Sequence, residues 1–282
     1  MEIIFNNKKD AECFHTHLKH QLHPFFFINH YQLVEDETAA KVIINIDGIE
    51  RIGPCIKAFY AFIVKNKLTD LYRSILRDQY FYTDEEEQEH ILHIIYSIMD
   101  GQREDLAAFI DEKSFKGPLE ETIKQVFKEK LSFSFDSFLK FRMRPLYEPL
   151  KRIVELSIDE YKMEQEYQYF IETLRHFIDG RKAKFSHLHL VIQEEITFYD
   201  HKFQKLSREQ LMKMIDRKLL SNHPVYVDSA TIAPLLSIAP SVVYVYTNDS
   251  EQPLVRTIKN IFEERVAVFR IECFNLKKFI GE

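Results

Sequence analysis

Apolar residues recur every three or four positions over long stretches of this chain, a spacing that predicts amphipathic helices. Residues 8–22 carry Phe14, Leu18 and Leu22 on one such stripe. A longer stripe runs through residues 54–80 and predicts one long helix there. Helices are therefore expected to be the main elements of the first part of the chain.

The middle of the chain carries the start signals of further helices. Thr83 and Glu86 have the spacing of a capping box, in which each side chain bonds the backbone of the other residue. Gly117 and Pro118 stand where a second helix is expected to open, and Pro149 suits the first turn of a third, long one. The middle is therefore predicted to be helical.

Short runs of β-branched and aromatic residues predict strands near both ends of the chain. Towards the N-terminus these runs fall at residues 3–5, 25–34 and 42–46. Together with the helices expected at 8–22 and 54–80, they give the element order βαββα.

The C-terminal part alternates between predicted strands and predicted helices. The strands are expected at residues 188–192, 196–203, 225–227, 242–246 and 266–271. The helices are expected at residues 207–219, 230–238 and 253–263. Strands joined through a helix usually pair in parallel, so this part is predicted to be a small α/β unit with parallel strands.

These patterns predict a mixed α/β protein that is rich in helix. We expect an N-terminal βαββα unit at residues 1–82, a helical region at 83–180 and a C-terminal α/β unit at 181–282. A chain of 282 residues is long for a single core, which also favours more than one unit.

Composition and charge narrow the class of protein. Charged residues make up 29% of the chain, and no run of roughly 18 uncharged apolar residues occurs, so no membrane insertion is expected. The N-terminus does not read as a secretory signal, and Cys13, Cys55 and Cys273 lie far apart, which favours a cytoplasmic protein with reduced thiols. Residues 84–180 hold more carboxylates than Lys and Arg, which argues against nucleic-acid binding.

The sequence displays no catalytic constellation. Its six glycines form neither a phosphate-binding loop nor a G-x-S-x-G nucleophile turn. His15, His17, His20 and His23 are spaced closely enough to suggest a metal site, but most lie off the apolar stripe of their helix and no completing ligand has an obvious spacing. We favour a solvated polar face and assign no catalytic residue, metal or cofactor.

Polar residues at strand ends of the C-terminal unit are candidate ligand-binding residues. They are Asp228, Asn248 and Asp249. Open α/β sheets bind ligands at the carboxyl ends of their strands, which is where these residues are expected to lie. The favoured alternative at residue 248 is a plain turn before a helix that Ser250 caps.

Basic residues gather locally within the acidic middle. The patch suits docking of an acidic partner or a phosphate group, and its members are Lys140, Arg142, Arg144, Lys151 and Arg152. The favoured alternative is ion pairing with Glu148, Glu155 and neighbouring helices.

Two segments of the middle carry a distinctive pattern. Residues 135–143 read FDSFLKFRM, and residues 158–171 contain E-Y-x-x-E-x-E-Y-x-x-F-I. Both resemble the YtxC family of sporulation proteins, as do residues 91–99 and 234–240. The resemblance implies a cytoplasmic protein of a spore-forming bacterium, and it implies no reaction.

The resemblance also selects residues to test. Phe141 and Arg142 occupy family-like positions, and with Arg144 they are the partner-contact candidates. The leading hypothesis is a non-enzymatic interaction or regulatory protein that acts around sporulation and binds a protein partner of unknown identity. The alternative is a small-molecule-binding protein or enzyme that uses the C-terminal α/β unit.

Overall fold

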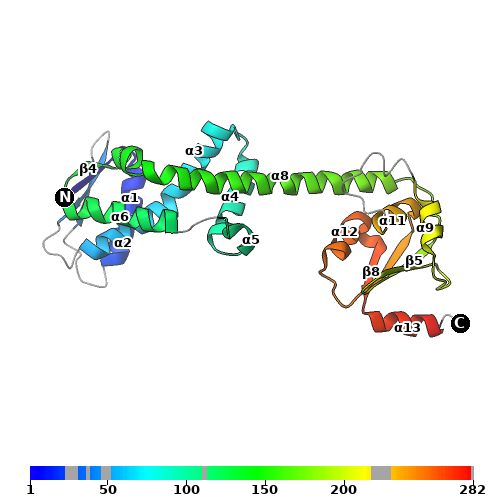
Figure 1. The fold of residues 1–282 in the computed structure, drawn as a ribbon. Coiled ribbons are helices and arrows are strands. Elements are labelled where there is room, and N and C mark those ends of the chain that lie inside the picture. The colour runs from blue at the N-terminus through cyan, green and yellow to red at the C-terminus, as the bar shows by residue number, and fades with distance from the viewer. Residues whose placement is uncertain (23–30, 36–38, 46–51, 110–112, 217–229, 281–282) are drawn as a thin grey trace. The chain divides into compact units, whose positions relative to one another are not determined.

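The computed structural model describes residues 1–282 except 23–30, 36–38, 46–51, 110–112, 217–229 and 281–282 (Figure 1). The described residues form two compact units, Met1–Met163 and Glu164–Glu282. Each unit contains a four-stranded sheet together with helices, so the predicted mixed α/β class is confirmed. The division of the chain into three parts stays a prediction.

The sheet of the first unit is mixed. Its strands are β1 (Glu2–Phe5), β2 (Tyr31–Glu35), β3 (Ala40–Ile44) and β4 (Phe133–Ser134), in the order β2-β3-β1-β4. β3 pairs antiparallel with β1 and β2, while β4 pairs parallel with β1. Alternation along β1 places Ile3 and Phe5 in the core. The strand expected at 25–34 is described only from residue 31 onward, and the one expected at 42–46 begins two residues earlier.

The first helices follow the apolar stripes closely. α1 (Lys8–Leu22) has the predicted bounds, and its stripe residues are buried. The long helix predicted at 54–80 runs without interruption through α2 (Ile52–Phe62), a π-helical turn η4 (Ile63–Lys67) and α3 (Leu68–Tyr80). The π-helical turn is a locally wider turn of the helix, and the spacing of apolar residues does not predict it.

Phenylalanine rings make up the centre of the first unit's core. Phe59 of α2 is fully buried, and its ring lies 5.2 Å from that of Phe14 and 5.2 Å from that of Phe138, both edge to face. Phe5 of β1 lies 4.9 Å from Phe135, so the sheet, the first helices and the segment after β4 share one cluster. Such aromatic pairs contribute about 0.5–1.5 kcal/mol each beyond the area that they bury.

Further helices precede β4 in the described part of this stretch. They are α4 (Glu85–Met99), α5 (Glu104–Ala107) and α6 (Lys113–Glu129). The predicted capping box of Thr83 and Glu86 is wrong by one residue, because Asp84 is the N-cap and its carboxylate accepts a hydrogen bond from the amide of Glu87 at 2.9 Å. Asp84 and Glu87 have the same spacing, and a carboxylate is favoured at the positive end of a helix.

The start of α6 is also corrected. Gly117 and Pro118 do not open this helix, which begins at Lys113 and holds the proline inside it. Phe115, in the added turn, is buried in the core. Burial of that ring therefore extends the helix past the local signal of the proline.

After β4 the chain passes through α7 (Phe135–Ser137), the π-helical turn η5 (Phe138–Arg142), the 3-10 turn η6 (Arg144–Leu146) and α8 (Tyr147–Ile178). The long helix expected from Pro149 is thus present. α8 supplies Ile153 and Val154 to the core of the first unit and Ile171 and Leu174 to the core of the second.

The second unit is built on its own sheet. Its strands are β5 (His187–Ile192), β6 (Ile196–Tyr199), β7 (Val242–Tyr246) and β8 (Val266–Phe269), in the order β6-β5-β7-β8. β5 and β6 form an antiparallel hairpin, while β7 pairs parallel with β5 and with β8. The predicted parallel strands are therefore confirmed.

In the described ranges of this unit, short helical segments accompany the sheet. They are α9 (Arg208–Met214), α11 (Ile232–Ile238), α12 (Pro253–Phe262), the 3-10 turn η7 (Glu263–Arg265) and α13 (Ile271–Ile280). α9 opens with the capping box of Ser207 and Gln210, but it ends at Met214, before residue 219. The strand expected at 225–227 lies outside the described residues. α13 occupies residues for which no helix is expected.

The two faces of the second sheet differ in character. The crossovers from β5 to β7 and from β7 to β8 move in the same direction along the sheet, so the right-handed rule places α11 and α12 on one face (Figure 1). The opposite face carries aromatic rings: His189 stacks on Tyr244 at 5.0 Å and shares a 3.0 Å hydrogen bond with the Tyr246 hydroxyl. Phe274 of α13 packs on that face, 5.1 Å from Tyr246.

Candidate partner-contact surface

The partner-contact candidates lie together on one segment of the first unit. We call residues 135–146, which comprise α7, η5 and η6, the ridge. The Ser134 hydroxyl caps its first turn by accepting a hydrogen bond from the amide of Ser137 at 3.4 Å. Phe135 and Phe138 bury their rings in the aromatic core and so fix the ridge to the unit.

The π-helical turn determines where Phe141 points. The amide of Met143 donates to the carbonyl of Phe138 at 3.2 Å, five residues back along the chain. In an α-helix Phe141, three residues after Phe138, would share its buried face. The wider turn moves Phe141 away from that face, and its side chain is 66% exposed.

A small hollow of about 210 Å³ adjoins the exposed ring. Phe133, Phe138, Phe141 and Arg142 contribute to its lining, together with Leu131, which is 61% exposed. The hollow is smaller than the roughly 300–1,000 Å³ of typical small-molecule pockets. Its size suits one or two inserted side chains rather than a metabolite.

A second, larger hollow uses the remaining side chains of the ridge. It measures about 660 Å³, and its lining includes Lys140, Met143 and Arg144 of the ridge with Leu71 and Tyr147. The ridge thus offers Phe141 and Arg142 to one hollow and Lys140 and Arg144 to the other.

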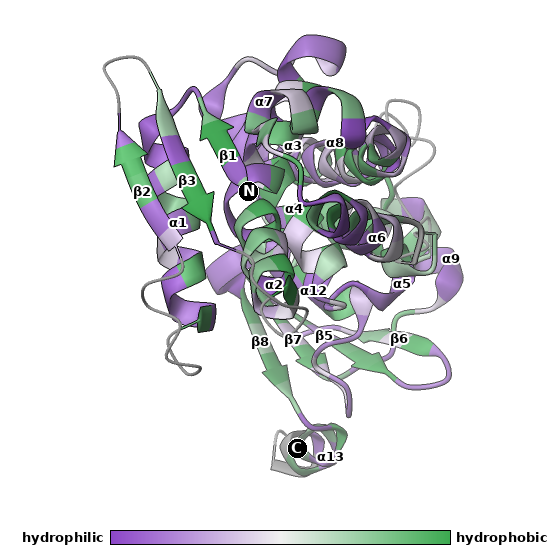
Figure 2. Ribbon diagram, turned by 90° about the vertical axis from the view of Figure 1, so that its left-hand side faces the viewer, coloured by the Kyte–Doolittle hydropathy of each residue, from purple (hydrophilic) through white to green (hydrophobic). Residues whose placement is uncertain are grey.

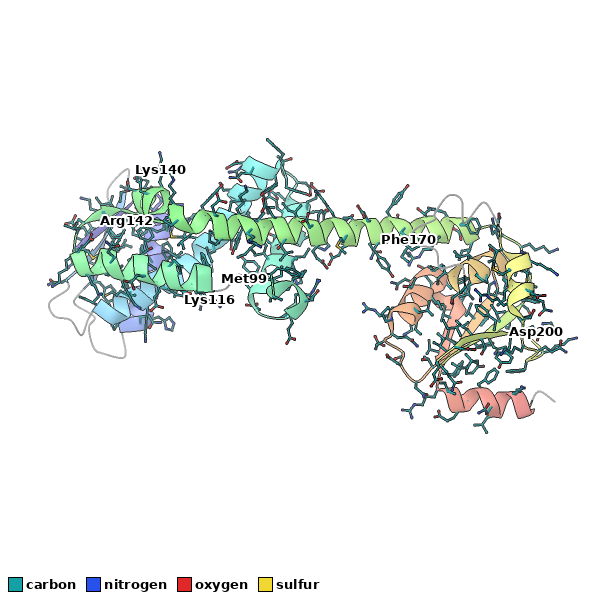
Figure 3. All side chains as sticks on the ribbon, in the orientation of Figure 1. Met99, Lys116, Lys140, Arg142, Phe170 and Asp200 are labelled. Carbon is teal, nitrogen blue, oxygen red and sulfur yellow. The ribbon has the colours of Figure 1, made fainter. Side chains whose placement is uncertain are left out.

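The charges of the ridge are loosely held. Arg142 lies 3.8 Å from a carboxylate oxygen of Glu129, and both side chains are well exposed, so this ion pair contributes little to stability. The Lys140 ammonium lies 5.7 Å from the centre of the Phe141 ring. Figure 3 labels Lys140 and Arg142 of the ridge. Arg144 has no ion pair among the residues that the structure describes. Lys151, which follows the ridge, lies 3.7 Å from Glu155, as the ion-pairing alternative expects. Among the described residues, Lys140 and Arg144 are therefore the basic side chains of the ridge that stay open to a partner.

The ligand-binding candidates of the second unit have a different setting. Asn248 and Asp249 follow β7 in a tight turn, where the Thr247 hydroxyl accepts from the Asp249 amide at 3.1 Å and Asp249 accepts from the Glu251 amide at 3.0 Å. The N-cap of α12 is Gln252, so the suggested capping by Ser250 is wrong. Asp228 lies outside the described residues.

Sequence reasoning missed a hollow in the second unit. It measures about 610 Å³ and is bordered by Glu194, Lys205, Arg208 and the buried Thr231. These residues come from the β5–β6 turn, from the segment between β6 and α9, and from the starts of α9 and α11. No local motif joins them, so only the assembled fold brings them together.

The histidine-rich helix α1 has ordinary structural contacts. The His17 Nε2 atom is hydrogen bonded to the Asn66 side-chain oxygen at 2.9 Å, and the His15 ring lies 5.2 Å from that of Tyr31. Within the described ranges, no group of three or more His, Cys, Asp or Glu residues is placed to hold a metal ion. In the same ranges, no helix has the length and apolar character needed to cross a membrane.

A partly buried lysine connects α1 to the π-helical turn η4. The Lys67 ammonium lies 3.1 Å from Asp10 and 2.5 Å from Asp70, and its side chain is 11% exposed. Burial disfavours the charged form, but hydrogen bonds from Lys67 to the two carboxylates outweigh it and raise the pKa of Lys67. Tyr72 of α3 is buried too; its hydroxyl has no hydrogen-bond partner among the described residues, and burial raises its pKa.

Comparison with known proteins finds a matching family and a similar protein. The sequence model of the YtxC-like family matches residues 55–267. A Bacillus subtilis (strain 168) protein described as "Uncharacterized protein YtxC" is 33% identical over 281 residues, which cover 97% of this chain and 95% of that protein. No solved structure gives a significant match.

Proposed function

We propose that this chain, which belongs to the YtxC-like family, is a non-enzymatic interaction protein that binds an acidic partner protein through the ridge. The observation that carries the proposal is the exposed Phe141, which a π-helical turn holds out beside a hollow and among basic side chains. Aromatic residues and arginine are the residue types enriched in protein interfaces.

Energetics favour Phe141 as the anchor of such a contact. Burying an exposed phenylalanine in a partner's pocket contributes about 1.5–3 kcal/mol. Interfaces draw most of their affinity from a few such side chains surrounded by weaker contacts. Lys140, Arg142 and Arg144 then select an acidic partner and speed its approach.

The cellular setting is part of the proposal. The resemblance to sporulation proteins supports a role in the cytoplasm during spore formation. Quantifying the protein through a synchronised sporulation time course tests this, and a constant level in growing and sporulating cells would count against it.

The experiment that tests the ridge compares two equally exposed phenylalanines. Tagged wild-type chain, Phe141→Ala and Phe109→Ala are purified gently from sporulating cells, and the intact complexes are weighed by native mass spectrometry. Phe109 is 65% exposed and lies outside the ridge, so it is a matched control. We expect a stoichiometric partner on the wild type and on Phe109→Ala but not on Phe141→Ala. Retention of the partner by Phe141→Ala contradicts the proposal.

A second candidate function is small-molecule binding in the 610 Å³ hollow of the second unit. Its volume falls in the usual range for ligand sites, and its polar lining includes Glu194, Lys205, Arg208 and Thr231. Thermal shifts against a panel of nucleotides and amino acids test this candidate. A shift lost in Arg208→Ala supports it, while no shift across the panel counts against it.

A further inference from the structure

β8 forms one edge of the second unit's sheet. The order β6-β5-β7-β8 leaves β8 with a single neighbouring strand among the described residues (Figure 2). A strand in this position has a row of backbone amides and carbonyls on its outer side.

The ladder with β7 determines which groups point outward. The Phe269 carbonyl accepts from the Thr247 amide at 2.9 Å, so Phe269 faces β7, and alternation gives Ala267 the same direction. Val266, Val268 and Arg270 therefore direct their backbone groups away from the sheet.

Only some of these outward backbone amides and carbonyls form hydrogen bonds to described residues. The Val266 amide donates to the Glu263 carbonyl, and the Arg270 carbonyl accepts from the Cys273 amide at 3.0 Å. Both backbone groups of Val268, the carbonyl of Val266 and the amide of Arg270 have no partner in the part of the chain that the structure describes. These four groups are spaced to bond another extended backbone.

The side chains of β8 suit the same role. The strand reads Val-Ala-Val-Phe, without the lysine or proline that commonly blocks an edge. Val266 and Val268 pack with the apolar core on the helix-covered face, and Phe269 lies 6.0 Å from Tyr244 in the aromatic layer. An added strand would thus extend both apolar layers of the sheet.

Charge at the two ends of β8 indicates the chemistry of the added strand. Arg265 precedes the strand and Arg270 follows it, and neither forms an ion pair with any residue that the structure describes. An apolar segment with a carboxylate at each end would pair with both arginines.

A second copy of the chain fits this edge less well. Full-length antiparallel pairing of two copies sets Val268, whose backbone points outward, opposite Ala267, whose backbone points to β7, so the hydrogen bonds cannot form. A shift of one residue that sets Val268 opposite itself places Arg270 opposite Val266, and the arginines gain no carboxylate.

We propose that β8 binds an extended segment of a partner protein by strand addition, and that this segment is apolar in the middle and acidic at both ends. This inference is independent of the ridge, because it concerns the other unit and a different kind of contact. The interaction protein would then hold partners at two surfaces.

A designed peptide tests strand addition directly. The probe is a fluorescent peptide of sequence Asp-Val-Ile-Val-Ile-Val-Asp, titrated with the full chain and followed by anisotropy. Two further peptides are controls: one has alternate backbone amides methylated, and the other has lysine in place of both aspartates. We expect each control to bind about tenfold or more weakly, because the first loses backbone hydrogen bonds and the second opposes the arginines.

Variants of the chain locate the contact. Val268→Pro removes an outward amide but no bond to β7, and we expect it to weaken binding of the acidic peptide about tenfold. Arg270→Glu is expected to abolish the preference between acidic and lysine-ended peptides, because Arg265 remains at the other end of the strand. Arg256→Glu, an exposed site on α12, is the charge control and should leave the preference unchanged.

Three results overturn the proposal. They are equal binding of the methylated peptide, no binding of the acidic peptide at millimolar concentration, and a chain dimer that Val268→Pro disrupts. The last outcome would assign the edge to a second copy. The methylated peptide decides the question even if a variant fails to fold.

Discussion

Replacing Phe59 with alanine is expected to destabilise the first unit strongly. Phe59 is fully buried, and its ring contacts six other phenylalanine rings: Phe14, Phe62, Phe127, Phe133, Phe135 and Phe138. It therefore connects α1, α6 and the ridge through one side chain. Its removal takes away the centre of the cluster that holds the ridge in place.

The expected loss is about 3–5 kcal/mol in the free energy of unfolding, as for other buried phenylalanines cut back to alanine. Area arithmetic agrees, since roughly 150–200 Å² at 25 cal/mol per Å² gives about 4–5 kcal/mol. Domains unfold with about 5–15 kcal/mol, so this single change removes a large share of the total.

Hydrogen exchange read by mass spectrometry is the suitable assay, because it follows each unit separately and the chain has no tryptophan for fluorescence. In Phe59→Ala, amides in α1, α2 and the ridge should exchange faster by the factor that corresponds to the loss. Phe109→Ala, at an exposed site, should change stability by less than about 0.5 kcal/mol. A loss below about 1 kcal/mol for Phe59→Ala would refute the aromatic-core reasoning.

Three further predictions test individual contacts. Asp84→Ala should cost about 1 kcal/mol by removing the α4 cap, while Thr83→Ala should have little effect; urea unfolding of both variants would decide which residue is the cap. Tyr72→Phe should leave stability unchanged or raise it by up to about 1 kcal/mol, since it deletes a buried hydroxyl without a partner, and a clear loss in thermal unfolding would contradict this. Lys67 has a raised pKa, so its stabilising contribution is complete below its unfolded value of 10.5 and is lost as pH rises through the folded value. Lys67→Met should therefore show a smaller fall in stability above pH 10.5 than the wild type in pH-dependent unfolding, and equal slopes would count against a stabilising ion pair of Lys67 with Asp10 and Asp70.

Sequence patterns predict this fold best where a local stripe and the tertiary core agree. The bounds of α1 are matched because Phe14, Leu18 and Leu22 all point to one core. The parallel pairing of β7 and β8 is likewise predicted from strand–helix–strand spacing. In these places local and global preferences coincide.

The predictions of helix starts are wrong where two local signals compete, or where a contact with a residue far along the chain determines the helix boundary. Thr83 and Asp84 both stand three residues before a glutamate, and spacing alone cannot choose between them. At α6 the burial of Phe115 outweighs the helix-start signal of Pro118. Tertiary context decides both cases.

The sequence predicts the residues of the candidate surface but not their conformation. Resemblance and the basic patch select Phe141, Arg142 and Arg144, but they do not indicate a π-helical turn, which depends on how Phe138 and its neighbours pack. The exposed edge of β8 is also hidden in the sequence, because Val266 to Phe269 read like any buried strand. Only the strand order places this strand at the edge.

The most direct test of the central claim is site-specific photocrosslinking in sporulating cells. A benzoylphenylalanine is placed at position 141 in one strain and at position 109 in another, and adducts are identified by mass spectrometry. The account predicts one defined protein adduct at position 141 and none at the equally exposed position 109. No adduct at 141, or the same adducts at both positions, would contradict the claim that the ridge binds a partner.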